Sequence, residues 1–119
     1  MIEREIFPKM AEKGELFSIT LDNKFWFDIG KPQDYILGQK GFLEYYNTKQ
    51  CQLQNNVEFI GNVMIHPSAK IHEGCKIGPN VVIDHDAEVF SGVCIKNATI
   101  LHHTKIKSHA YIENSIISW

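Results

Sequence analysis

One carboxylate in the first part of this sequence stands where it could bind a metal ion. Asp28 follows the aromatic run Phe25-Trp26-Phe27 and precedes the turn residue Gly30. Hard cations such as Mg²⁺ take carboxylate oxygens and often need only one or two from the protein, so Asp28 is a candidate magnesium ligand. The same residue type is also common in turns and helix caps. From the local pattern alone, the turn interpretation of Asp28 is the favoured one.

Histidines are the second kind of candidate functional residue, and all of them lie in the second half of the chain. A histidine that acts as a base or a zinc ligand usually has a partner that orients it. We find no His-x-His pair and no carboxylate-anchored cluster around these residues, so we expect solvent-facing turn residues. The histidines are His66, His72, His85, His102, His103 and His109.

A six-residue repeat organises the second half and places these histidines. An aliphatic β-branched residue recurs at Ile65, Ile71, Ile77, Ile83, Val89 and Ile95, and after one dropped residue at Ile100, Ile106 and Ile112. Small or compact residues follow four positions later, at Ala69, Cys75, Val81, Ala87, Val93, Thr99, Thr104, Ala110 and Ile116. A period of six fits neither an amphipathic helix nor a simple hairpin, but it is typical of a hexapeptide parallel β-helix with three hexads per coil. Nine hexads predict about three coils with the β-branched residues inside, and they bring His85 and His102 close together one coil apart.

The first half predicts a mixture of helices and strands. A helix over 1–13 would be interrupted near Pro8 and capped by Gly14, and a second helix would run from Pro32 to about Asn47. Strands are expected over 16–21 and 24–29. Two helices and two strands cannot bury the aromatic residues of this half. We therefore expect 1–47 to be the edge of a larger α/β domain. Residues 48–60 would be a linker and 61–119 the β-helix.

Composition narrows the classes of partner. The net charge is −2 without a block of like charges, which gives no support for a nucleic-acid or anionic membrane partner, and no apolar run is long enough to span a membrane. The three cysteines are odd in number and lack C-x-x-C spacing, which favours free thiols and a cytoplasmic setting.

Several strings resemble mannose-1-phosphate guanylyltransferases (GDP-mannose pyrophosphorylases) over essentially the whole chain. They are Ile2-Glu3-Arg4-Glu5-Ile6-Phe7-Pro8-Lys9-Met10-Ala11, Phe25-Trp26-Phe27-Asp28-Ile29-Gly30-Lys31-Pro32, Gly61-Asn62-Val63, Ile77-Gly78-Pro79-Asn80-Val81 and Ile106-Lys107-Ser108-His109. The resemblance implies a left-handed β-helix behind an α/β remnant, and a fragment of an enzyme that makes GDP-mannose and pyrophosphate from GTP and mannose-1-phosphate with Mg²⁺. It also implies that Asp28 is one of two carboxylates on that metal, which reverses the preference for a turn role.

The departures from this family pattern are equally informative. The glycine-rich phosphate loop, the first metal-binding aspartate and the Glu-Lys-Pro segment that binds the sugar phosphate are missing from this sequence. We therefore expect no catalytic or cofactor-binding residue besides Asp28, and no activity from the chain alone. The alternative is a non-catalytic assembly or regulatory module, and a homo-oligomer is expected. A small hexapeptide acyltransferase or carbonic-anhydrase-like trimer is disfavoured for want of a convincing histidine site.

Overall fold

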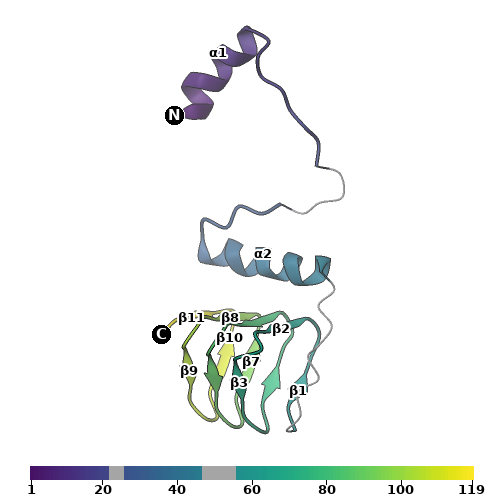
Figure 1. Cartoon of the computed structure of the whole chain (residues 1–119), viewed down its shortest axis with the longest axis vertical. Coiled ribbons are helices and arrows are strands. Elements are labelled where there is room, and N and C mark those ends of the chain that lie inside the picture. The colour runs from purple at the N-terminus through teal and green to yellow at the C-terminus, as the bar shows by residue number, and fades with distance from the viewer. Residues whose placement is uncertain (22–25, 47–55) are drawn as a thin grey trace.

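The structure, a computed structural model, describes residues 1–21, 26–46 and 56–119. In Figure 1 a β-helix lies at one end, one helix lies against it, and the N-terminal helix stands apart. The prediction of a mainly parallel β fold with a preceding helical part is confirmed. Within the described residues, no helix combines the length and the apolar character needed to cross a bilayer.

The N-terminal helix forms much as expected. A π-helical turn, η1 (Ile2–Ile6), leads into α1 (Phe7–Glu12), and Pro8 lies in the first turn of α1. Gly14 adopts φ +69° just after the helix, and its N–H donates to the carbonyl of Ala11 at 3.0 Å. Glycine ends the helix because it reaches this left-handed conformation without strain.

The two strands predicted in the first half are wrong for the residues that can be judged. Residues 16–21 and 26–29 form no strand, and the former are exposed throughout. A strand is held by hydrogen bonds to a neighbouring strand, and no described segment pairs with either stretch. The start of the second predicted strand and most of the predicted linker lie outside the described residues.

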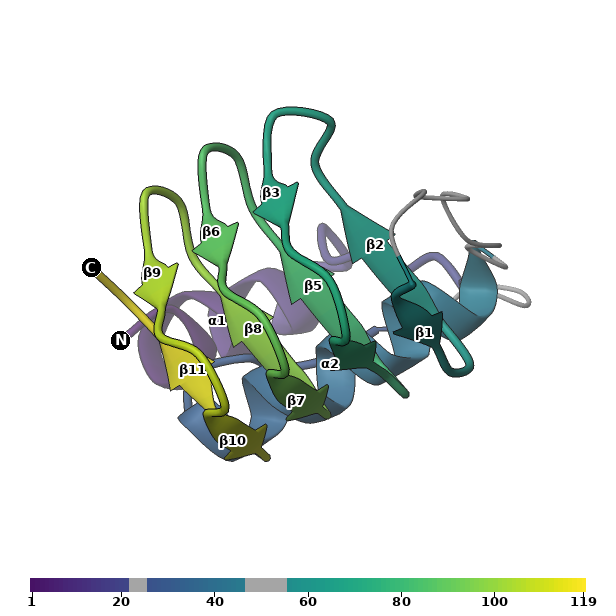
Figure 2. The same cartoon turned by 90° about the horizontal axis from the view of Figure 1, so that it is seen from below.

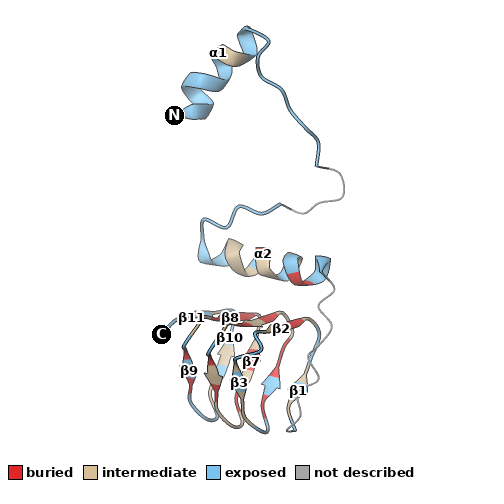
Figure 3. Ribbon diagram, in the orientation of Figure 1, coloured by how far each residue is buried: buried red, intermediate tan, exposed pale blue. Residues whose placement is uncertain are grey.

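The second helix is confirmed as α2 (Pro32–Tyr45), with proline in its first turn. Figure 1 shows α2 lying along one face of the β-helix. Buried residues gather in the β-helix, and α2 adds Gly38 and Leu43 to them (Figure 3).

Eleven short strands build the β-helix. They are β1 (Glu58–Phe59), β2 (Val63–Ile65), β3 (Lys70–Ile71), β4 (Lys76–Ile77), β5 (Val81–Ile83), β6 (Glu88–Val89), β7 (Cys94–Lys96), β8 (Ala98–Ile100), β9 (Lys105–Ile106), β10 (Tyr111–Glu113) and β11 (Ile116–Ile117). They form three parallel sheets in the orders β1-β4-β7-β10, β11-β8-β5-β2 and β3-β6-β9. Figure 2 shows successive coils side by side. Among the described residues the strands make between three and four coils, more than the nine hexads predicted, because β1 precedes the first recognisable hexad and β11 follows the ninth.

Identical positions of successive coils stack to make the core. Parallel pairing places Ile65, Ile83, Ile100 and Ile117 in one column, and Phe59, Ile77, Ile95 and Ile112 in another. The predicted core residues of the central coils are buried, whereas Ile65, Ile71 and Ile112 are partly buried and pack against that core. Each of these three pairs with a neighbouring strand on only one side. They therefore receive less cover than the residues of the central coils.

The coil that ends at β8 is one residue shorter than the coil before it, and this changes the predicted inward positions at Thr99 and Ile116. Lys76 pairs with Cys94, eighteen positions on, whereas Val81 pairs with Ala98, seventeen positions on. Ala98 therefore takes the inside position that the pattern gave to Thr99. Thr99 and Ile116, which pair with each other, belong to the sheet that faces α2. Thr99 is bonded to that helix instead of pointing into the core.

Left-handed backbone at the corners explains their polar residues. Asn80, Asn97 and Asn114 share one corner and all have positive φ. Asp86 (φ 55°) and His103 (φ 56°) share another. Asparagine, aspartate and histidine are enriched among non-glycine residues in this conformation. The polar residues that interrupt each hexad therefore occupy the bends between flat sheets.

Candidate functional site

Asp28 lies on the surface just before α2. Its Oδ1 accepts a hydrogen bond from the backbone N–H of Gly30 at 3.0 Å, a bond typical of a turn. Within the described residues, no group of three potential ligands includes Asp28. Among the residues that the structure describes, Asp28 is therefore a single oxygen donor without two further ligands around it.

Two glycines of α2 hold the segment that carries Asp28 against the helix. A Cβ on Gly41 would lie 2.7 Å from Cε2 of Phe27, and one on Gly38 would lie 3.1 Å from Cγ2 of Ile29. Only a helix face without side chains at these two positions admits the segment so closely. Phe27 and Ile29, on either side of Asp28, are thereby anchored, and the carboxylate between them is left at the surface.

The helix α2 is also bonded to the β-helix, through the side-chain amide of Gln39. Nε2 of Gln39 donates to the backbone carbonyls of Asn80 (2.9 Å) and Ala98 (3.2 Å). The hydroxyl of Thr99 donates to Oε1 of the same side chain. Gln39 thus joins two neighbouring coils to the helix, and through the helix to the segment of Asp28.

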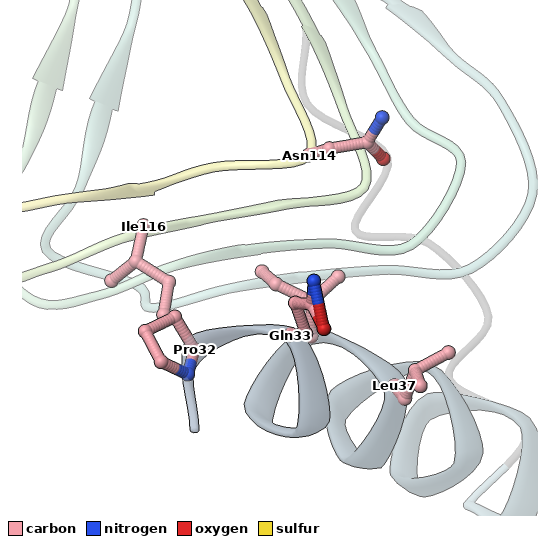
Figure 4. Close-up of a pocket in the computed structure, with 6 residues that line it drawn as sticks. Pro32, Gln33, Leu37, Asn114 and Ile116 are labelled. Atoms are coloured by element: carbon pink, nitrogen blue, oxygen red, sulfur yellow. The ribbon is translucent and has the colours of Figure 1, made fainter.

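An apolar groove opens between α2 and the last coil. Its volume is about 720 Å³, and Figure 4 shows side chains of the helix and the coil facing it. The lining residues are Pro32, Gln33, Ile36, Leu37, Asn114 and Ile116. Leu37 is 56% exposed in this groove, which therefore offers an apolar surface to a partner.

The histidines lie outside the strands and none is buried, as expected, but several of them contact one another. The rings of His85 and His102 stack at 5.0 Å between centroids with an interplanar angle of 3°, which confirms their predicted proximity. The expectation that no carboxylate accompanies them is wrong. Oδ1 of Asp84 lies 2.9 Å from Nδ1 of His85, and Oδ2 of Asp86 lies 3.9 Å from Nδ1 of His103.

Asp84 is the best-held carboxylate of this group. The backbone N–H of His85 donates to Oδ1 of Asp84 at 2.7 Å, and this bond, followed by the bond from the imidazole, lowers the pKa of the carboxyl. Asp84 is therefore a charged acceptor for the His85 ring. The string Asp84-His85-Asp86 was a visible signal for this cluster, but its link to His103 required the stacking of two coils.

Comparison with known protein families gives a match to the β-helix. The family described as "GMPPB C-terminal domain" matches residues 59–119. The chain is 41% identical over 119 residues to the "Probable mannose-1-phosphate guanylyltransferase 3" of Oryza sativa subsp. japonica and to the "Mannose-1-phosphate guanylyltransferase 1" of Arabidopsis thaliana. It is 44% identical to the "Mannose-1-phosphate guanylyltransferase catalytic subunit beta" of Xenopus tropicalis.

These matches cover 99% of this chain, yet the chain spans only 33% of each of those three relatives. The matched family region begins at Phe59 within β1 and contains the three stacked sheets. Over that region the repeat, the fold and the family match agree, and the chain belongs to the GMPPB C-terminal domain family.

Proposed function

We propose that this chain is the C-terminal part of a nucleotidyltransferase that forms GDP-mannose and pyrophosphate from GTP and mannose-1-phosphate. The observation that carries the proposal is the 41–44% identity to named guanylyltransferases over almost the whole chain. The chain alone is inactive, because its sequence lacks a glycine-rich loop for the nucleotide phosphates. Two unpaired thiols among the described residues, Cys75 and Cys94, suit a cytoplasmic location.

Asp28 is the residue of this chain that we assign to the chemistry. Its carboxylate would be one oxygen ligand of Mg²⁺, and the second carboxylate and the phosphates would come from the rest of the enzyme and its substrates. Bound there, the ion would neutralise phosphate charge during transfer of the guanylyl group. The role of this chain is to position the carboxylate, through Phe27 and Ile29 packed on α2 and α2 bonded to the β-helix.

A chimera tests this function. The part of the rice relative that this chain does not cover, joined to residues 1–119, should release pyrophosphate from GTP and mannose-1-phosphate with Mg²⁺. Asp28→Asn should lower kcat by about a hundredfold or more, because a metal ligand acts on the charge of the transition state. Asp34→Asn, the same chemical change in the first turn of α2, is the matched control and should retain activity within about twofold.

The outcomes separate the two parts of the proposal. A folded but inactive chimera would contradict the assignment to guanylyl transfer. An active chimera that is unaffected by Asp28→Asn would leave the function standing and remove Asp28 from the metal site. Turnover by the 119-residue chain alone would show that the missing loop is not needed.

The groove beside α2 favours a second candidate function, that of an assembly module. We propose that a second copy of the chain covers this groove, giving a homo-oligomer, because an apolar surface of this kind is typical of protein contacts. Light scattering over a dilution series should show a dimer or larger species that Leu37→Asp dissociates. Leu16→Asp, at an exposed leucine outside the groove, should leave it intact. A wild-type monomer at micromolar concentration would contradict this candidate.

A further inference from the structure

Histidine and aspartate side chains of two coils meet at the corner between the β11-β8-β5-β2 sheet and the β3-β6-β9 sheet, which we call the histidine corner. The turn that joins β5 to β6 carries Asp84, His85 and Asp86, and the turn that joins β8 to β9 carries His102 and His103. Parallel pairing of β5 with β8 and of β6 with β9 stacks these turns, which Figure 2 shows as adjacent loops. The proposed guanylyl transfer makes no use of this corner.

Three side chains at this corner converge. His85, Asp86 and His103 each offer one ligand atom, and these atoms all lie within 4.8 Å of one another. The rings of His85 and His103 are 5.3 Å apart between centroids. Asp86 and His103 share the same left-handed backbone, so the paired strands hold both at equivalent places of the two turns.

The surrounding contacts orient this group before any ligand arrives. Asp84 accepts from Nδ1 of His85, which leaves Nε2 as the nitrogen available to a metal. The backbone N–H of Asp86 donates to Oγ of Ser68 at 2.9 Å, which fixes the turn of Asp86 to the coil before it. His102 stacks flat on His85 and further limits the rotation of that ring.

We propose that His85, Asp86 and His103 bind one divalent transition-metal ion of the zinc class at the surface of the β-helix. Two imidazole nitrogens and one carboxylate oxygen suit Zn²⁺ and its neighbours in the first row, whereas Mg²⁺ prefers oxygen ligands only. Asp86 and His103 are exposed, so further coordination positions stay open to water. The ion joins two successive coils, so its binding stabilises the β-helix.

Titration of the untagged 119-residue chain with ZnCl₂ tests the proposal. Calorimetry should show saturable binding of one Zn²⁺ per chain, and thermal unfolding should shift to higher temperature. His103→Asn and Asp86→Asn should each weaken binding at least tenfold, and asparagine keeps the left-handed backbone accessible at both positions. Asp84→Asn should weaken it about tenfold through the orientation of His85.

His109→Asn is the matched control. His109 is exposed and has φ 62°, but it lies at a different corner of the coil, so its variant should bind Zn²⁺ like the wild type. Binding that is absent, or that His109→Asn weakens as much as His103→Asn, would overturn the proposal. If a variant at His103, Asp86 or Asp84 fails to fold, nuclear magnetic resonance of the wild type tests whether Zn²⁺ binds at this corner. Zn²⁺ must shift the imidazole signals of His85 and His103 and leave that of His109 in place.

Discussion

Replacement of Ile83 by alanine tests the stacked core at its centre. Ile83 is 1% exposed and lies between Ile65 of the coil before it and Ile100 of the coil after it. The substitution removes three carbon atoms from this column, which is about 2.4 kcal/mol of lost burial at roughly 0.8 kcal/mol per methylene group. The sheets limit collapse around the gap, and a cavity term brings the expected loss of unfolding free energy to about 3–4 kcal/mol.

Urea unfolding of the 119-residue chain, followed by far-ultraviolet circular dichroism, measures this loss. Ile19→Ala removes the same atoms from a side chain that is 87% exposed, and it should change the free energy of unfolding by less than about 0.5 kcal/mol. A loss below about 1 kcal/mol for Ile83→Ala, or equal losses for the two variants, would refute the stacked core. A changed slope of the urea dependence would show that the coils no longer unfold together.

Three further predictions concern buried and half-buried polar groups. Burial raises the pKa of the Cys75 thiol, so alkylation at pH 8 should label the half-buried Cys94 well before Cys75. Because the thiol ionises at lower pH in the unfolded chain, the contribution of Cys75 to stability is present below about pH 8.5 and is lost as the pH rises. Replacement of Cys75 by alanine should reduce this decline in stability. Gln39→Ala should lower the unfolding free energy by about 1–3 kcal/mol in urea titrations, because it leaves the carbonyl of Asn80 without this donor. Thr104→Val should raise the melting temperature, because the buried hydroxyl of Thr104 has no hydrogen-bond partner among the described residues; a lower melting temperature would show that the hydroxyl is satisfied.

The repeat could be predicted because every strand of every coil must point one side chain into the same narrow core. A β-branched residue every six positions is needed wherever three flat sheets enclose a narrow core, so Ile77, Ile83 and Ile95 carry the signal without knowledge of their neighbours. The start of the fold was less visible. Phe59 lies six positions before Ile65 and fills the same column as Ile77, but it is aromatic and not β-branched, so the first strand falls within the predicted linker.

Strands in the first half could not be decided from alternation. Residues 16–21 alternate like a strand, but alternation describes only which side chains would face a sheet, and a sheet also needs a partner backbone. The interface of α2 was invisible for a related reason. Gln39 is an unremarkable polar residue in a helix, and its role depends on the carbonyls of Asn80 and Ala98, which the turns of the β-helix bring beneath it.

The histidine corner shows how a solenoid creates sites that no local motif contains. Asp86 and His103 are seventeen positions apart, one coil of this length, and both take a left-handed conformation because the chain must bend there. The bend selects residues that tolerate this backbone, and aspartate, asparagine and histidine do so while also being metal ligands or hydrogen-bonding groups. Parallel stacking then sets the side chains of one column about a strand spacing apart, close enough for two to share one ion. A corner built for backbone reasons can thus gather ligand atoms from two coils, and a search for such sites must compare positions one coil apart as well as neighbours in sequence.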